Sequence, residues 1–224
     1  YKLLEHPIEA NDDIRRNIGL EPGNGTKVTI EGNNQIIKCP GYDTFKRQLA
    51  NHYALRDINS SPYRNVYLRF VNWKGATSSI PISYSLPQGD LIDSRIINLT
   101  TYNDKIRVTI KISKEQLDSP RNNPYGQAGF LIKTKGAILD LQLFKYEYDE
   151  EGLYFFGEVY CPGIAEMLEA DKQGLIDPNR AGLKWSHPYC AKVRSEIEKI
   201  LTPHIDHKKK ELQKKSKAII SGHV

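Results

Sequence analysis

The stretch "GQAGFLIKTKGAILDLQLFKYEY", residues 126–148, decides the fold. Two strongly apolar runs flank the dipeptide Lys135-Gly136 within it, a pattern typical of a β-hairpin with a two-residue turn. Gly136 supplies the positive φ angle that such a turn requires. The hairpin places Lys133 and Lys135 at its tip. Two interpretations of the tip stay open: a solvated basic turn, or a lysine that a rigid element presents to a phosphate group.

Antiparallel strand patterns extend from this hairpin in both directions along the chain. Short turns such as residues 72–75 and the Asn103-Asp104 pair join these patterns, which favours hairpins. The further predicted strands cover residues 66–71, 78–84, 95–102, 105–112 and 153–161, and an earlier hairpin pairs residues 26–30 with 34–39. The middle of the chain is therefore β-dominated, and Pro162 and Gly163 end this part.

Helices are predicted before and after the β-dominated middle. The pattern of the first twenty residues is partly helical and ends at Gly19. Another helix is expected from residue 43, with Asp43 or Thr44 as its N-terminal cap. Its residues at helical spacing, expected to face the core, are Phe45, Leu49, His52 and Tyr53. A short helix over residues 164–170 follows the last strand.

The chain ends in a long predicted helix that starts at Ser186, where Pro188 is tolerated in the first turn. Its apolar stripe consists of Val193, Ile197, Ile200, Leu201 and Ile205. The following residues 207–217 hold six lysines and one glutamate, so their net charge of +5 equals that of the whole chain. Basicity is therefore local, and this segment is either a solvated helix face or a contact for nucleic acid.

The composition is that of a globular domain, with 39% hydrophobic and 26% charged residues. The longest apolar runs, such as residues 153–156, are too short to span a bilayer, so no membrane partner is expected. The opening residues lack the basic and then apolar pattern of a signal peptide, so none is expected from them. The three cysteines, Cys39, Cys161 and Cys190, are spaced too widely for a disulfide framework or a zinc pattern. Reduced thiols favour the cytoplasm, or the nucleus in a eukaryote.

The histidines offer two weak candidates for chemistry. His204 and His207 have the spacing of metal ligands on a helix, but no matching cysteine or carboxylate set accompanies them, so surface residues are favoured and no metal site is predicted. His187 and Cys190 hold the residue types of a Cys/His nucleophile. Because no flanking signature surrounds them, this pair is discounted.

The other candidate for a phosphate contact is "GNGTKVTI", residues 23–30. The turn lacks the Lys-Ser/Thr ending of a Walker A loop and the spacing of a dinucleotide-binding motif. By composition alone it is a turn that leads into a strand.

Taken in order, these segments resemble the GHKL ATPases, the superfamily of gyrase, the large heat-shock chaperone, histidine kinases and MutL. "GTKVTI" is similar to their last glycine motif. "FKRQLANHYALRD" with "RNVYLRFVNWKG" resembles the start of the transducer domain in MORC-type members, and "YGQAGFLIKTKGAILD" resembles the later transducer hairpin with its lysine. "LYFFGEVYC", "GLKWSHPY" and the long helix match the closing section. The likeness covers the chain from about residue 19 to residue 211.

The resemblance implies an α+β fold, with a mixed, largely antiparallel sheet of ribosomal-protein-like βαβ type, flanking helices and a long C-terminal helix. Residues 1–40 would be the trailing strands of a Bergerat-type ATP-binding domain, residues 41–185 the transducer, and residues 186–224 a basic helix leading to a further region. The metal-binding helix and the Asp-x-Gly-x-Gly motif of the family are not found in the sequence. We therefore expect ATP and Mg²⁺ to bind only in the intact protein, and this chain alone to be inactive.

The resemblance also assigns individual residues. Thr26 matches the threonine that reaches toward adenine, and Gly23 and Gly25 match the glycines before it. Lys135 matches the transducer lysine that contacts the γ-phosphate, and Lys133 is the alternative if the hairpin register differs by two residues. The implied function is to sense that phosphate and to couple ATP binding to domain movement and homodimerisation.

A second hypothesis from a different class remains. The chain would be a nucleic-acid-binding or scaffold module that contacts DNA through its basic C-terminal segment. The partner implied by the first hypothesis is instead the upstream ATP-binding domain of the same protein.

Overall fold

The structure is a computed structural model, and it describes residue 13 and residues 40–71, 74–170, 174–177 and 182–221. The chain divides into two units, Tyr1–Pro40 and Gly41–Val224, and the helices and strands from α2 to α5 all lie in the second. Apart from Asp13, the helix predicted in the first twenty residues and the hairpin predicted over residues 26–39 lie outside the described residues.

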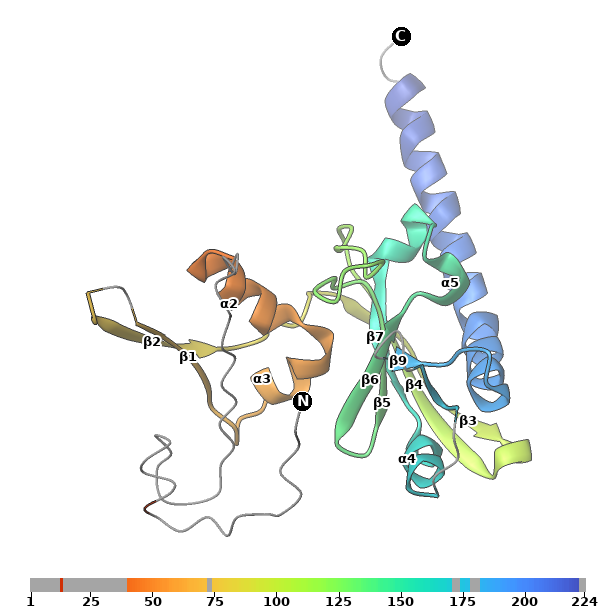
Figure 1. Ribbon diagram of the computed structural model, residues 1–224. Helices are drawn as coiled ribbons and strands as arrows, with labels where there is room; N and C mark the ends of the chain where they lie inside the picture. The colour runs from red at the N-terminus through yellow and green to blue at the C-terminus, as the bar shows by residue number, and fades with distance from the viewer. Residues whose placement is uncertain (1–12, 14–39, 72–73, 171–173, 178–181, 222–224) are drawn as a thin grey trace. The chain divides into compact units, whose positions relative to one another are not determined.

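The centre of the second unit is a five-stranded sheet with the strand order β3-β4-β7-β5-β6 (Figure 1). Its strands are β3 (Asp90–Leu99), β4 (Asp104–Ile112), β5 (Gly129–Thr134), β6 (Ala137–Gln142) and β7 (Phe155–Tyr160). All neighbours pair antiparallel except β5 and β7, which are parallel. The predicted fold class, α+β with a mixed and largely antiparallel sheet, is confirmed.

The parallel pair arises from the connection between β6 and β7. The chain leaves β6 through the 3₁₀ turns η3 (Phe144–Tyr146) and η4 (Glu150–Tyr154) and returns as β7 beside β5. The prediction that one strand runs from residue 137 to 148 is wrong beyond Gln142. Phe144 adopts a φ of 55°, which an extended strand does not allow, and its buried ring lies against Phe130 and Trp185.

One face of the sheet forms the main core, and α5 (Pro188–Ser221) lies along it (Figure 1). Alternate residues of β4 point into this core, because side chains in a strand alternate between its two faces. The buried residues that meet there include Ile106, Val108, Ile110, Phe130, Ile132, Val193, Ile197, Leu201 and Ile205. Four of the five stripe residues predicted for the long helix are thus buried, and the fifth, Ile200, is partly buried.

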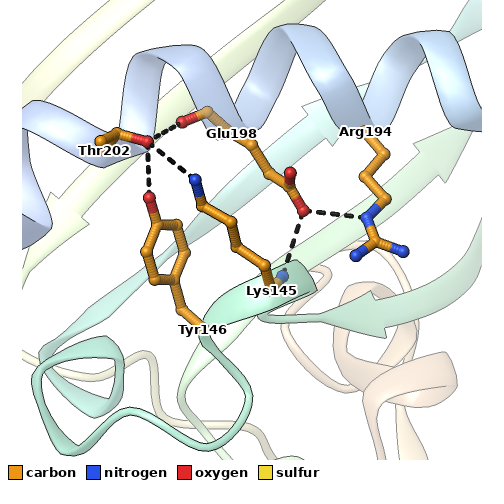
Figure 2. A network of polar contacts seen from close by, with 5 residues as sticks. All are labelled: Lys145, Tyr146, Arg194, Glu198 and Thr202. Carbon is orange, nitrogen blue, oxygen red and sulfur yellow. Dashed lines mark hydrogen bonds and ion pairs between the residues drawn. The ribbon is translucent and has the colours of Figure 1, made fainter.

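A polar network fastens η3 to α5 (Figure 2). Glu198 accepts hydrogen bonds from the backbone N–H of Lys145 at 3.1 Å and from Nε of Arg194 at 2.8 Å. The hydroxyl of Thr202 lies 2.6 Å from that of Tyr146 and accepts from Nζ of Lys145 at 3.2 Å. The network holds the β6–β7 connection against the helix.

Two short helices and a separate hairpin precede the main sheet. The helices are α2 (Tyr42–Asn51) and α3 (Arg56–Asn59), with the 3₁₀ turn η1 (Tyr53–Leu55) between them. β1 (Val66–Val71) pairs antiparallel with β2 (Thr77–Ile82). A short helix, α4 (Pro162–Glu169), follows β7, and the pair β8 (Ile176–Asp177) and β9 (Gly182–Leu183) precedes α5.

Two predictions about α2 are wrong. The helix begins at Tyr42 with Gly41 at the cap, so Asp43 and Thr44 lie inside the first turn and cap nothing. None of its residues is buried, and Phe45 remains 42% exposed, so the side of α2 predicted to face the core is not buried. Tyr53, in η1 beyond the helix, does pack against a second buried cluster, formed by Leu131, Ile138 and Leu141. His52 lies just beyond the helix and accepts a hydrogen bond from the backbone N–H of Ala54.

Candidate functional site

The β5–β6 hairpin has a two-residue turn, as predicted. Thr134 pairs with Ala137, which leaves Lys135 and Gly136 as the loop. Gly136 has a φ of +76°, a conformation that favours glycine, and nothing lies within 4 Å of the position that a Cβ would take. Lys135 is exposed, and within the described part of the chain it makes no ion pair or side-chain hydrogen bond. The turn therefore presents one uncommitted ammonium group on a rigid support.

Lys133, two residues earlier, is already committed to protein partners. Its Nζ lies 2.7 Å from Oδ1 of Asp57 in α3 and 2.7 Å from Oε1 of Glu158 in β7, and only 14% of the side chain is exposed. Burial by itself would lower the pKa of Lys133, but the hydrogen bonds to the two carboxylates outweigh it and leave that pKa above its ordinary value. Lys133 thus joins α3 to the sheet.

The other site residues assigned by resemblance belong to the segment before residue 40. Gly23, Gly25 and Thr26 lie outside the described residues. The candidate site reduces to the hairpin and the elements that support it.

Arg56 is the supporting residue that the sequence did not indicate. It is 2% exposed, its Nε donates to the carbonyl oxygen of Asn51 at 3.1 Å, and its Nη2 donates to that of Gly126. The guanidinium lies over the ring of Tyr84, 4.9 Å from the centroid. Arg56 therefore ties the end of α2 to the segment that leads into β5. The string "ALRD" carries no signal that this arginine is buried.

A second network of hydrogen bonds joins the start of β4 to the N-terminal ends of α4 and α5. Asp104 accepts hydrogen bonds from the hydroxyl of Tyr189 at 2.6 Å and from the backbone N–H of Gly163 at 3.2 Å. Tyr189 is fully buried against Tyr102. A carboxylate at the start of a helix is favourable, so this network fixes α4 and α5 to the β3–β4 turn.

The discounted Cys/His pair does not form a nucleophile. Cys190 is 1% exposed, and burial raises the pKa of its thiol to about 12. His187 accepts a hydrogen bond from the backbone N–H of Tyr189 through Nδ1, which is a structural role. Among the described residues, no group of three or more histidine, cysteine or acidic side chains could hold a metal ion.

The basic part of α5 separates into buried and exposed lysines. Lys208 is 5% exposed, with its Nζ 4.3 Å from the ring centroid of Tyr154 and 3.3 Å from Glu211. Lys215 also pairs with Glu211. Four lysines are exposed and make no ion pair with another described residue: Lys209, Lys210, Lys214 and Lys217. None of the described helices is long and apolar enough to cross a membrane.

Comparisons of the chain with protein-family models, with curated proteins and with solved structures find no match.

Proposed function

We propose that the unit from Gly41 onward is the transducer part of a GHKL-type ATPase, in which Lys135 contacts the γ-phosphate of ATP. The observation that carries this proposal is the different state of the two lysines of the hairpin. Lys133 is held by Asp57 and Glu158, whereas Lys135 is exposed at the turn. Of the two hairpin lysines, Lys135 is the one that can approach a phosphate without breaking described ion pairs that support the hairpin.

In this proposal ATP and Mg²⁺ are bound by an ATP-binding domain whose main walls are not part of this sequence. A charge-assisted lysine–phosphate hydrogen bond contributes about 1.5–3 kcal/mol. A ligand that binds one of two domain arrangements more tightly by this amount shifts the equilibrium between them about tenfold or more. Closure around ATP would then promote homodimerisation and hydrolysis by the whole protein, while the present chain alone hydrolyses nothing.

The test is ATP turnover by the protein that carries the complete ATP-binding domain. Lys135→Ala removes the proposed contact, and Lys105→Ala is the matched control because Lys105 is also an exposed lysine but lies in β4 rather than in the turn. Turnover that falls at least tenfold in the first variant and stays unchanged in the second supports the proposal. Equal turnover in all three proteins removes Lys135 from the mechanism.

A second candidate function, contact with DNA, is favoured by the four exposed lysines of α5. Three of them, Lys210, Lys214 and Lys217, follow one another at intervals of four and three residues, so they share one side of the helix. Duplex DNA binding measured by fluorescence anisotropy should weaken with salt, and changing these three lysines to alanine should reduce the log–log slope by about 2–3. A slope that the triple variant leaves unchanged would rule out this surface.

A further inference from the structure

Arg56 is a buried cation that has no carboxylate partner among the described residues. Its contacts there are the carbonyl oxygens of Asn51 and Gly126 and the ring of Tyr84. Burial lowers the pKa of Arg56, and the neighbouring phenol of Tyr84 is the group that opposes this shift. A guanidinium is nevertheless always charged in proteins, and buried charges are ordinarily paired. Arg56 therefore carries an uncompensated charge in this part of the molecule.

The hydrogen-bonding capacity of Arg56 is also only partly used. A guanidinium carries five N–H groups in a planar fork. Nε donates one bond and Nη2 another, and no described residue accepts a hydrogen bond from Nη1. The remaining donors are available to a planar or tetrahedral oxyanion, which such a fork binds through two parallel hydrogen bonds.

The side chain of Arg56 lines a cavity of about 200 Å³ on the face of the sheet opposite α5. Leu131 and Phe156 supply apolar walls, and several polar groups share the space. The lining residues with polar side chains are Tyr84, Thr109, Gln127, Lys111 and Glu158. Glu158 is already bound to Lys133 at 2.7 Å, so it does not serve as the counter-ion of Arg56.

Size and donor number decide which anion fits. Pockets for whole small molecules hold about 300–1,000 Å³, so a cavity of about 200 Å³ suits a single compact group. Two cations and several neutral donors can donate more hydrogen bonds than the two oxygens of a carboxylate accept. A phosphate group has more acceptor oxygens and a second negative charge. Lys111 is half-buried and makes no ion pair with a described residue, so its ammonium is available.

We propose that this cavity binds one phosphate group, with Arg56 as the bidentate ligand and Lys111 as the second cation. The site goes beyond the proposed function and does not depend on it. Lys135 lies four residues beyond Leu131 along the hairpin, which corresponds to about 13 Å between the two Cα atoms at the rise of a strand. Lys135 does not line the cavity, so it is not counted as a ligand of this phosphate group. The phosphate neutralises the charge of Arg56 and joins α3 to β4.

The experiment titrates the 224-residue chain with inorganic phosphate by isothermal calorimetry, with chloride at matched ionic strength as the blank. Lys111→Met is the main variant, since it removes a cation without breaking a described ion pair or hydrogen bond of its side chain. Lys105→Met is its matched control in the same strand, outside the cavity lining. Arg56→Lys keeps the charge but removes the fork, and circular dichroism verifies that it folds.

We expect saturable phosphate binding that Lys111→Met weakens about tenfold and that Lys105→Met leaves unchanged. A phosphomonoester such as glycerol 3-phosphate identifies the source of the group. Tighter binding of the ester supports the terminal phosphate of a larger molecule, and tighter binding of phosphate supports the free ion. Absence of binding by the unchanged chain, or equal binding by the Lys111 and Lys105 variants, overturns the proposal even if Lys135 proves to contact ATP.

Discussion

Lys133 Nζ lies 2.7 Å from Oε1 of Glu158 on the neighbouring strand β7. With the second contact to Asp57, this ion pair closes a connection between α3, β5 and β7. It distinguishes two lysines that are only two residues apart, Lys133 near the end of β5 and Lys135 in the turn that follows the strand. One lysine supports the hairpin, and the other is exposed at its turn.

The first prediction separates these two roles by stability. Lys133→Ala should lower the free energy of unfolding by about 1–2 kcal/mol, because it removes two charge-assisted hydrogen bonds from a largely buried ammonium while both carboxylates stay partly solvated. Lys135→Ala should change it by less than about 0.5 kcal/mol, as at other exposed sites. Urea unfolding of the two variants provides the comparison, and equal losses would show that Lys133 has no special supporting role.

The second prediction concerns the backbone of the turn. Gly136→Ala should cost about 1 kcal/mol, because a side chain at a φ of +76° is strained even though nothing lies within 4 Å of the added carbon. Gly136→Asn should cost less, since asparagine tolerates this conformation better. Thermal unfolding of both variants checks the order. An alanine variant as stable as the unchanged chain would mean that the turn relaxes to another conformation.

The third prediction is a pH dependence at the contact between β3 and α5. Asp93 accepts a hydrogen bond from Nε of Arg95 at 2.9 Å, and its other oxygen lies 3.4 Å from Nε2 of His204. The hydrogen bonds from Arg95 hold the pKa of Asp93 below its ordinary value of 3.8, against burial, and His204 adds to the effect.

A lowered pKa means that the folded chain gains stability above pH 3.8 and loses it as the pH falls through the folded-state value. Asp93→Asn should therefore cost at most about 1 kcal/mol at pH 5–7, since Arg95 is more than half exposed. The difference from the unchanged chain should shrink steadily below about pH 4. Denaturant unfolding at a series of pH values measures it, and a difference independent of pH would contradict the assignment.

The fourth prediction concerns thiol reactivity. Cys161 and Cys190 are buried, and burial raises the pKa of each thiol to about 12. Because the thiolate is the reactive form, iodoacetamide at about pH 7.5 should leave both unmodified in the folded chain and label both in urea. Peptide mass spectrometry reports each cysteine separately. Rapid labelling of either one without denaturant would show that this part of the core opens easily.

Local signals in the sequence predicted β4 and β7 closely, whereas β3 (Asp90–Leu99) begins and ends earlier than the strand predicted over residues 95–102. Two apolar runs around a Lys-Gly turn located β5 and β6, and the helical stripe located α5. The errors fall where tertiary contacts override local pattern. Packing against Phe130 and Trp185 holds Phe144 at a positive φ and ends β6 early, although the sequence continues to alternate.

The candidate site was harder to predict than the fold. Lys133 and Lys135 are only two residues apart in the sequence, and the carboxylates that bind Lys133 lie 76 and 25 residues away from it along the chain. Arg56 is buried through carbonyl oxygens, and one of these belongs to Gly126, seventy residues later. No local pattern records such partners, so the anion cavity could only be found from the packed structure.

The most direct test of the central claim is nucleotide binding by the protein with its complete ATP-binding domain, before and after Lys135→Ala. We expect affinity for a non-hydrolysable ATP analogue to fall about tenfold, which corresponds to about 1.4 kcal/mol. Affinity for ADP, which lacks the γ-phosphate, should stay unchanged. If the variant binds the ATP analogue as tightly as the unchanged protein does, or loses ADP affinity equally, Lys135 does not sense the γ-phosphate.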